Sequence, residues 1–291
     1  MSALEAAIAE ACGSAVARAR RTSGGDINEA LAVELADGRH LFVKHRPDPP
    51  TGFYAAEAAG LDWLAGAGAL PVPRPVAATG AFLALEWVDA GRRGAGFDAA
   101  LGAGLAALHA AGAGRHGATA DGGPTFLGPL ALANDPAGDG GWAAFYGERR
   151  LAPLVRMAAD ARALPSGAAE RIGRVIDRLG ELCGREVAPA RLHGDLWSGN
   201  VMAGPDGGPW LVDPAAYGGH PEVDLAMLRL FGAPGPAFLD AYEDVAPLPE
   251  GHAERVELFQ LLPLLVHAVL FGGGYGASAD RAARRLSLIH I

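Results

Sequence analysis

The run HGDLWSGN at residues 193–200 constrains this chain of 291 residues more than any other segment. Two apolar runs, 201–202 and 210–212, follow it and flank a turn rich in glycine, a pattern that predicts a β-hairpin. A hairpin brings its outer ends together, so Asn200 and Asp213 should lie side by side. Carboxylate and amide oxygens suit Mg²⁺, which takes its other ligands from water and phosphate. The sequence therefore predicts one magnesium site beside Asp195.

The spacing of His193, Asp195 and Asn200 is that of a kinase catalytic loop. This chemistry needs a carboxylate facing the attacking hydroxyl, the role predicted for Asp195. It also needs metal ligands, the role predicted for Asn200 and Asp213. The structural alternative is that each Asp only ends a turn or a strand, which would be favoured for either residue alone. Their joint spacing argues against it. His193 is expected to hydrogen-bond the loop backbone.

The pattern upstream predicts a small lobe of strands with few helices. Residues 3–20 suggest an Ala-rich helix, and the runs 30–35 and 39–44 suggest a hairpin through Asp37-Gly38. A helix is expected over 53–66 and a strand over 81–87. The segment 91–96 is the best linker candidate, and the remainder is mostly helical, with an irregular stretch over 113–141. The sequence thus predicts an α+β chain with lobes 1–90 and 91–291.

Several residues of the first lobe are candidates for nucleotide binding. A Gly-containing turn can cover phosphates with its N–H groups, and a strand Lys can hold them. Glu57 lies on the apolar stripe of the predicted helix, where an unpaired carboxylate would be costly, so Lys44 is its expected partner. The crossing from strand to linker would offer backbone groups to adenine. The candidates are Gly24, Gly25, Asp26, Asn28, Lys44, Glu57, Glu86 and Val88.

Composition narrows the classes of partner. The chain has 24 Lys and Arg against 33 Asp and Glu, a net charge of −9, which disfavours nucleic acid and anionic membranes as partners. Two distant cysteines exclude a disulfide scaffold and a cysteine-based zinc site. We expect no signal peptide and no membrane span, and hence a cytoplasmic protein. His40, His45, His109 and His267 show no ligand spacing and are expected to be ordinary surface or core histidines.

With these residues in view, the chain resembles the fructosamine kinase (ketosamine-3-kinase) family, within the aminoglycoside and choline kinase-like group. The matching blocks are GGDIN at 24–28, LEW at 85–87, HGDLWSGN at 193–200, DPAAYGGHPEVDLAML at 213–228 and FGGGYG at 271–276. The resemblance implies a bilobal protein-kinase-like fold that uses ATP and Mg²⁺. It also implies phosphorylation of the sugar 3-hydroxyl of small or protein-bound ketosamines, as deglycation repair.

The resemblance also bears on the acceptor site. Trp197 is expected either to pack in the core or to face the substrate sugar, and Tyr217 and His220 are expected to line the sugar site. Asp224 either caps a helix or, as the resemblance implies, braces the catalytic loop. Two alternatives stay open: a kinase for another amine-bearing alcohol such as an aminoglycoside, and a catalytically inactive nucleotide-binding module. Oligomeric state is left open.

Overall fold

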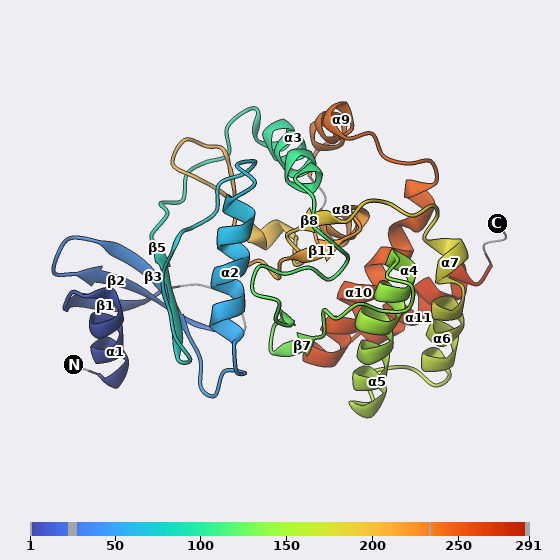
Figure 1. Ribbon diagram of the computed structural model, residues 1–291, viewed down its shortest axis with the longest axis horizontal. Helices are drawn as coiled ribbons and strands as arrows, with labels where there is room; N and C mark the ends of the chain where they lie inside the picture. The colour runs from blue at the N-terminus through green and yellow to red at the C-terminus, as the bar shows by residue number, and fades with distance from the viewer. Residues whose placement is uncertain (1, 23–27, 233, 289–291) are drawn as a thin grey trace.

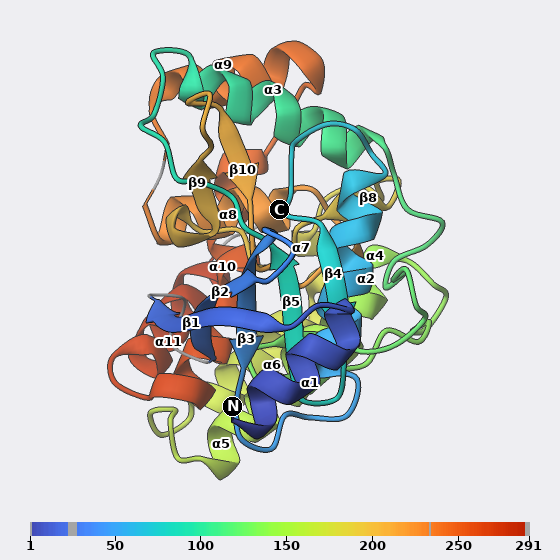
Figure 2. The same ribbon diagram turned by 90° about the vertical axis from the view of Figure 1, so that its left-hand side faces the viewer.

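The first part of the chain forms a five-stranded antiparallel sheet with one helix on each face (Figures 1 and 2). The computed structural model describes residues 2–22, 28–232 and 234–288. The strand order is β1-β2-β3-β5-β4. Asp37-Gly38 joins β2 to β3 as predicted, with Gly38 at φ +88°. The elements are α1 (Ala3–Cys12), β1 (Val16–Thr22), β2 (Glu29–Leu35), β3 (His40–His45), α2 (Phe53–Ala65), β4 (Pro75–Ala78) and β5 (Phe82–Glu86).

The alternation of side chains in β5 explains how both faces of the sheet are covered. Phe82 and Ala84 pack on the side of α1, whereas Leu83 and Leu85 pack on the side of α2. Successive side chains of a strand point to opposite faces, so an apolar run serves two helices at once. In Figure 1, α1 lies on the outer side of the sheet and α2 lies between the sheet and the helical lobe.

The prediction of one helix over residues 3–20 is wrong. The helix ends at Cys12, because Gly13 adopts φ +68° and its N–H bonds back to the last turn. Residues 16–22 then pair with β2, with one shift of register between Val16 and Arg18. Alanine content favoured a helix, but the glycine cap and the unpaired edge of β2 decide the local structure.

The remainder of the chain is mainly helical. Short antiparallel pairs, β6–β7, β8–β11 and β9–β10, lie among the helices. The stretch 113–141, predicted to be irregular, thus contains the small β6–β7 hairpin. The elements are α3 (Phe97–Ala110), β6 (Thr125–Leu127), β7 (Leu130–Leu132), α4 (Trp142–Phe145), a π-helical turn (Tyr146–Leu151), α5 (Ala152–Asp160), α6 (Ala168–Asp177), α7 (Leu179–Leu182), β8 (Ala190–Leu192), a 3₁₀ turn (Ser198–Asn200), β9 (Val201–Ala203), β10 (Pro209–Leu211), β11 (Tyr217–Gly219), α8 (Glu222–Leu230), α9 (Pro236–Val245), α10 (His252–Phe271) and α11 (Tyr275–Leu286).

An extended connector joins the sheet to α3 and is fastened to the β9–β10 hairpin. Gly91 N–H donates to the carbonyl of Ala203 and Gly94 N–H to that of Gly207, at 2.8 and 3.0 Å. A Cβ on Gly91 would lie 2.0 Å from the carbonyl oxygen of Gly204, so only glycine fits there. The lobe boundary predicted at residue 90 falls in this connector and stays a prediction.

Helix α10 is a long helix with a largely buried apolar surface. Pro263 lies inside it and has no N–H for the carbonyl of Phe259. The hydroxyl of Tyr146 lies nearby and donates to the carbonyls of Leu258 and Phe259. Within the described residues, no helix is long and apolar enough to cross a membrane.

Helices α3 and α9 cross closely at Gly102. A Cβ there would lie 2.0 Å from the carbonyl oxygen of Phe238, which is backbone and cannot rotate away. We expect Gly102→Ala to lower the free energy of unfolding by about 2 kcal/mol through this overpacking. Gly173→Ala in α6 is the matched control, since nothing lies within 4 Å of its added methyl group.

The control should be neutral or stabilising by up to about 1 kcal/mol, because alanine is the better helix former. Urea unfolding of both variants measures the difference. Equal effects of the two substitutions would contradict the close crossing of α3 and α9.

Candidate active site

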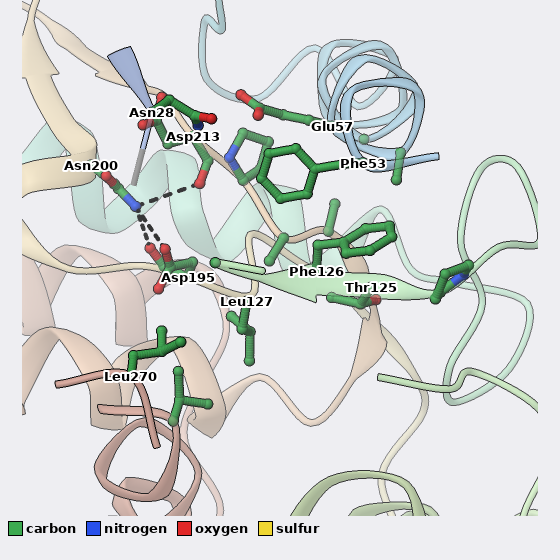
Figure 3. Close-up of a pocket in the computed structure, with 18 of the residues that line it drawn as sticks. Asn28, Phe53, Glu57, Thr125, Phe126, Leu127, Asp195, Asn200, Asp213 and Leu270 are labelled. Atoms are coloured by element: carbon green, nitrogen blue, oxygen red, sulfur yellow. Dashed lines mark hydrogen bonds between the residues drawn. The ribbon is translucent and has the colours of Figure 1, made fainter. Parts of the chain in front are cut away.

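A cavity of about 440 Å³ lies where the two lobes meet. Its walls come from α2, the loop before and including β6, the loop after β8, and the ends of α10 and α11. Figure 3 shows Asn28, Glu57 and Asp213 on one side of Asp195, and Leu270 of α10 on the other. Asp195, Asn200 and Asp213, predicted from loop spacing, therefore share one cavity with Lys44 and Glu57.

Lys44 is the centre of the charged side of the cavity. Its Nζ lies 2.5 Å from Glu57 Oε1 and 2.6 Å from Asp213 Oδ1. The lysine is buried, and burial alone would lower its pKa. The charges of Asp213 and Glu57 outweigh this effect and raise the pKa of Lys44, so the side chain stays an ammonium. The structure thus contains the predicted pair of Lys44 and Glu57 and adds Asp213 to it.

Asn200 connects the two aspartates. Its Nδ2 donates to the Asp195 carbonyl at 2.8 Å and to Asp195 Oδ2 at 3.3 Å, and lies 3.5 Å from the Asp213 carbonyl (Figure 3). These bonds use the amide nitrogen and leave Oδ1 available to accept or to bind a metal. Asp213 adopts φ +55°, a left-handed conformation that is uncommon outside glycine. The hairpin therefore turns sharply at the point where its carboxylate meets Lys44.

Burial raises the pKa of Asp195 to about 7, and the neighbouring charge of Asp213 acts in the same direction. The carboxyl group is thereby a stronger proton acceptor than an aspartate in water. Such a shift is typical of groups that move protons in active sites.

The loop that carries Asp195 is held by the buried carboxylate of Asp224. Asp224 accepts from His193 N–H at 2.8 Å and from Gly194 N–H at 2.9 Å, and His109 Nε2–H donates to it at 3.2 Å. Asp224 lies in the first turn of α8 and does not cap that helix. Its bracing role agrees with the expectation from the resemblance. His109, expected to be an ordinary surface or core histidine, is buried and belongs to this network.

His193 bonds the loop backbone, as predicted. Its Nε2–H donates to the Val212 carbonyl at 2.9 Å, and its Nδ1 faces the Asp195 N–H at 3.3 Å. Burial lowers the pKa of His193 and keeps it neutral, which suits one donor and one acceptor nitrogen. The imidazole joins the loop to the end of the hairpin, with both ring nitrogens facing backbone groups.

The sequence profile of fructosamine kinases matches residues 1–288. The chain belongs to the fructosamine kinase family. A relative in Enterococcus faecium, named a probable ketoamine kinase, is 35% identical over 261 residues, covering 89% of this chain and 91% of the relative. The protein-ribulosamine 3-kinase of Arabidopsis thaliana is 34% identical over 262 residues, covering 88% and 78%.

Solved structures agree with this family membership. The crystal structure of a Thermobifida fusca protein described as a fructosamine-3-kinase has a TM-score of 0.90 at 42% identity, and the match covers 99% of each chain. A choline kinase from Streptococcus pneumoniae has a TM-score of 0.65 at 16% identity, covering 99% of this chain and all of that one, and so shares the fold. The predicted bilobal protein-kinase-like fold and the prediction of a kinase are confirmed.

Of the other residues predicted to bind the nucleotide, some line the cavity and some do not. Asn28 lines the cavity, and the Tyr54 hydroxyl donates to its Oδ1 at 3.3 Å. Glu86 ends β5, and its carboxylate accepts a hydrogen bond from Arg74 N–H, just before the neighbouring strand β4. Glu86 and Val88 lie outside the set that lines the cavity. Their proposed backbone contacts to adenine stay predictions. Gly24, Gly25 and Asp26 lie outside the described residues.

Trp197 lines the cavity, but Tyr217 and His220 do not. Tyr217 is fully buried, with the Arg150 guanidinium 4.2 Å from its ring centroid. His220 is buried against Trp142 and Phe259, and burial lowers its pKa to about 3. The expectation that Tyr217 and His220 line the sugar site is therefore wrong. Tyr217 begins β11, which pairs with β8, and its side chain lies in the helical core, while His220 directly follows that strand.

Sequence reasoning missed the part of the cavity beyond Asp195. Four rings from the ends of α8, α10 and α11 line it: Phe231, His267, Phe271 and Tyr275. The block FGGGYG signals two of them, because consecutive glycines allow the chain to reverse between α10 and α11. His267 gave no signal, since a lone histidine in an apolar helix is typical of a core residue.

We expect Asp224→Ala to lower the free energy of unfolding by about 3 kcal/mol, because it leaves two buried loop N–H groups without a hydrogen-bond acceptor. Amide exchange at His193 and Gly194 should accelerate more than exchange in the distant sheet β1–β5. Asp240→Ala, an exposed position of α9, is the control and should change neither. Unchanged protection of these two amides in the Asp224 variant would show that the carboxylate does not hold the loop.

Proposed function

We propose that this chain transfers the γ-phosphoryl group of ATP to the sugar 3-hydroxyl of ketosamines. The observation that carries the proposal is the convergence of Asp195, Asn200, Asp213 and Lys44 on one cavity in a member of the fructosamine kinase family. A phosphate ester at this position is expected to be unstable, and loss of the sugar would free the amine. The reaction would then act as deglycation repair.

The donor set suits Mg²⁺ brought in with a nucleotide. Asn200 Oδ1 and the Asp213 carboxylate are hard oxygen ligands, and Mg²⁺ takes its remaining ligands from phosphate and water. Among the described residues, no group of three or more His, Cys, Asp or Glu side chains could hold a metal alone. That absence disfavours a zinc-like protein cage for those residues. When bound, Mg²⁺ would neutralise charge that develops on the phosphates.

Lys44 and Asn28 would hold the nucleotide from the sheet side, and Gly24, Gly25 and Asp26, which lie outside the described residues, are proposed to bind its phosphates. Lys44 carries a full charge beside Asp213, so it can pass from the carboxylate to a phosphate oxygen when the nucleotide enters. Glu57 keeps its hold on Lys44 and fixes the ammonium in the cleft.

Asp195 would orient the acceptor hydroxyl in line with the γ-phosphorus. The hydroxyl oxygen forms a bond to phosphorus while the bond from phosphorus to the leaving oxygen breaks, and ADP departs. The proton of the hydroxyl goes to the Asp195 carboxylate. Positioning and charge neutralisation dominate such a loose transition state, so Asp195 needs only to accept this proton late.

Family membership favours ketosamines over aminoglycosides as acceptors. The relatives are named for ketoamines and ribulosamine. Trp197, which is 40% exposed at the cavity, would offer its indole face to a sugar ring of either acceptor class. The Arabidopsis relative is named for a protein-bound acceptor, and we propose that both free and protein-bound ketosamines enter this cavity.

A substrate panel tests the proposal. The chain is given Mg²⁺ and ATP with fructosyl-lysine, ribulosyl-lysine or kanamycin, and ADP release is measured together with the site of phosphate by ³¹P NMR. We expect turnover on a ketosamine, with phosphate on the 3-hydroxyl. Turnover on kanamycin alone would favour the aminoglycoside alternative. Thermal stabilisation by Mg-ATP without any turnover would favour an inactive nucleotide-binding module.

Asp195→Asn should retain ATP binding and lower kcat by roughly a hundredfold or more, because the amide cannot take the proton. Asp206→Asn, in the exposed turn of the β9–β10 hairpin, is the control with the same chemical change. Steady-state kinetics and calorimetric titration of ATP separate the two effects. Near-normal turnover of the Asp195 variant would remove this residue from the role.

A further inference from the structure

Four side chains form a ring-lined end of the cavity on the far side of Asp195 from the nucleotide residues. We call Phe231, His267, Phe271 and Tyr275 the aromatic box. His267 is its centre, with ring centroids 4.6 Å from Phe231, 5.0 Å from Tyr275 and 5.4 Å from Phe271. All four line the same cavity as Asp195, and Leu270 marks this end in Figure 3.

The box is connected to the catalytic loop. Ser198 Oγ donates to the Phe231 carbonyl at 2.7 Å, which joins the loop after Asp195 to the end of α8. At the other side, Gly272 and Gly273 adopt φ values of +65° and +62°. This turn reverses the chain between α10 and α11 and returns Tyr275 to His267. The position of the box relative to Asp195 is therefore defined by two fixed connections.

His267 has a defined tautomer. Its Nδ1 lies 2.8 Å from the Pro263 carbonyl, which can only accept, so Nδ1 carries the proton. Burial lowers the pKa of His267 and favours the neutral ring. In a neutral imidazole with a proton on Nδ1, Nε2 is an acceptor. The box therefore combines aromatic faces with one lone pair.

The charges around the cavity favour a cationic occupant. Among the described residues that line it, Lys44 is the one cation, against the carboxylates of Glu57, Asp121, Asp195 and Asp213. The box itself contributes no charge. Aromatic faces attract ammonium groups, and a protonated secondary amine also has two N–H groups to donate.

Resting on the proposed function, we propose that the aromatic box binds the protonated amine of the ketosamine, with His267 Nε2 accepting one of its N–H groups. The amine lies on C1, two carbons from the 3-hydroxyl. A sugar whose 3-hydroxyl faces Asp195 can place this amine in the neighbouring box. His267 is then a specificity residue that distinguishes amine-bearing ketoses from amine-free ones.

The test compares two acceptors that differ in one atom: 1-butylamino-1-deoxyfructose and the 1-O-butyl ether of fructose. The wild-type chain should show a KM at least about tenfold lower for the amine. His267→Phe keeps a ring but removes the acceptor, and it should raise KM for the amine toward that of the ether. It should leave kcat and the KM for ATP unchanged. His267→Gln, which restores an acceptor, should recover part of the preference.

His252→Phe is the matched control, because it makes the same change on the same helix about four turns away, and it should alter nothing. Phe271→Leu, at the exposed rim, is a second variant in case His267→Phe folds poorly. It should raise KM for the amine and leave KM for the ether unchanged. Equal loss on amine and ether, or an unchanged preference in the variants, would overturn the inference.

Calorimetric titration of both acceptors in the presence of Mg-ADP separates this inference from the proposed function. If the amine binds in a manner that depends on His267, but the panel with Mg-ATP shows no phosphoryl transfer, the kinase proposal is contradicted and the box is supported. Transfer to the ketosamine with no dependence of binding on His267 would overturn the box alone.

Discussion

The ammonium of Lys44 is the interaction on which the site depends. It lies between Glu57 of α2 and Asp213, residues that come from opposite lobes and are far apart in the sequence. Three buried or half-buried charges at this point would be unstable without one another. Their mutual compensation keeps Lys44 charged, fixes α2 against the sheet and brings the end of the β9–β10 hairpin into the cavity. A nucleotide with its metal offers both partners of the Lys44–Asp213 contact new ligands of the right charge.

The rest of the site is built from backbone bonds that hold the loop around Lys44 and Asp213. Asp224 anchors the loop before Asp195 through two N–H groups, and His193 joins that loop to the hairpin. Gly194 adopts φ +82°, and a Cβ there would lie 2.1 Å from the Ala215 carbonyl oxygen. The loop can therefore take this path only with glycine at that position. Fixed geometry of this kind is what phosphoryl transfer requires.

Local patterns predicted the parts of this structure that local chemistry decides. Asp37-Gly38 predicted its hairpin because few residue pairs fit such a turn, and the spacing of Asp195, Asn200 and Asp213 predicted their convergence because a hairpin pairs its ends. Lys44 and Glu57 were predictable because a carboxylate on an apolar stripe needs a cation.

Features that depend on long-range packing escaped prediction. Strand β1 forms because β2 offers an edge, which an Ala-rich pattern cannot reveal. Tyr217 and His220 follow Asp213 closely in the sequence, yet both are buried in the core, Tyr217 within β11, which pairs with β8, and His220 just after that strand. His267 reaches the cavity only because α10 and α11 meet there, and no spacing in the sequence signals it.

Calorimetric titration of ADP, with and without Mg²⁺, into the wild-type chain and Asp213→Asn tests the central claim most directly. The claim is that the Asp213 carboxylate gives up its contact with Lys44 and binds the metal when the nucleotide enters. The wild-type affinity should rise by roughly tenfold or more with Mg²⁺, a gain of about 1.4 kcal/mol, and the variant should lose this gain while still binding ADP alone. A full gain from Mg²⁺ in the Asp213 variant would contradict the account.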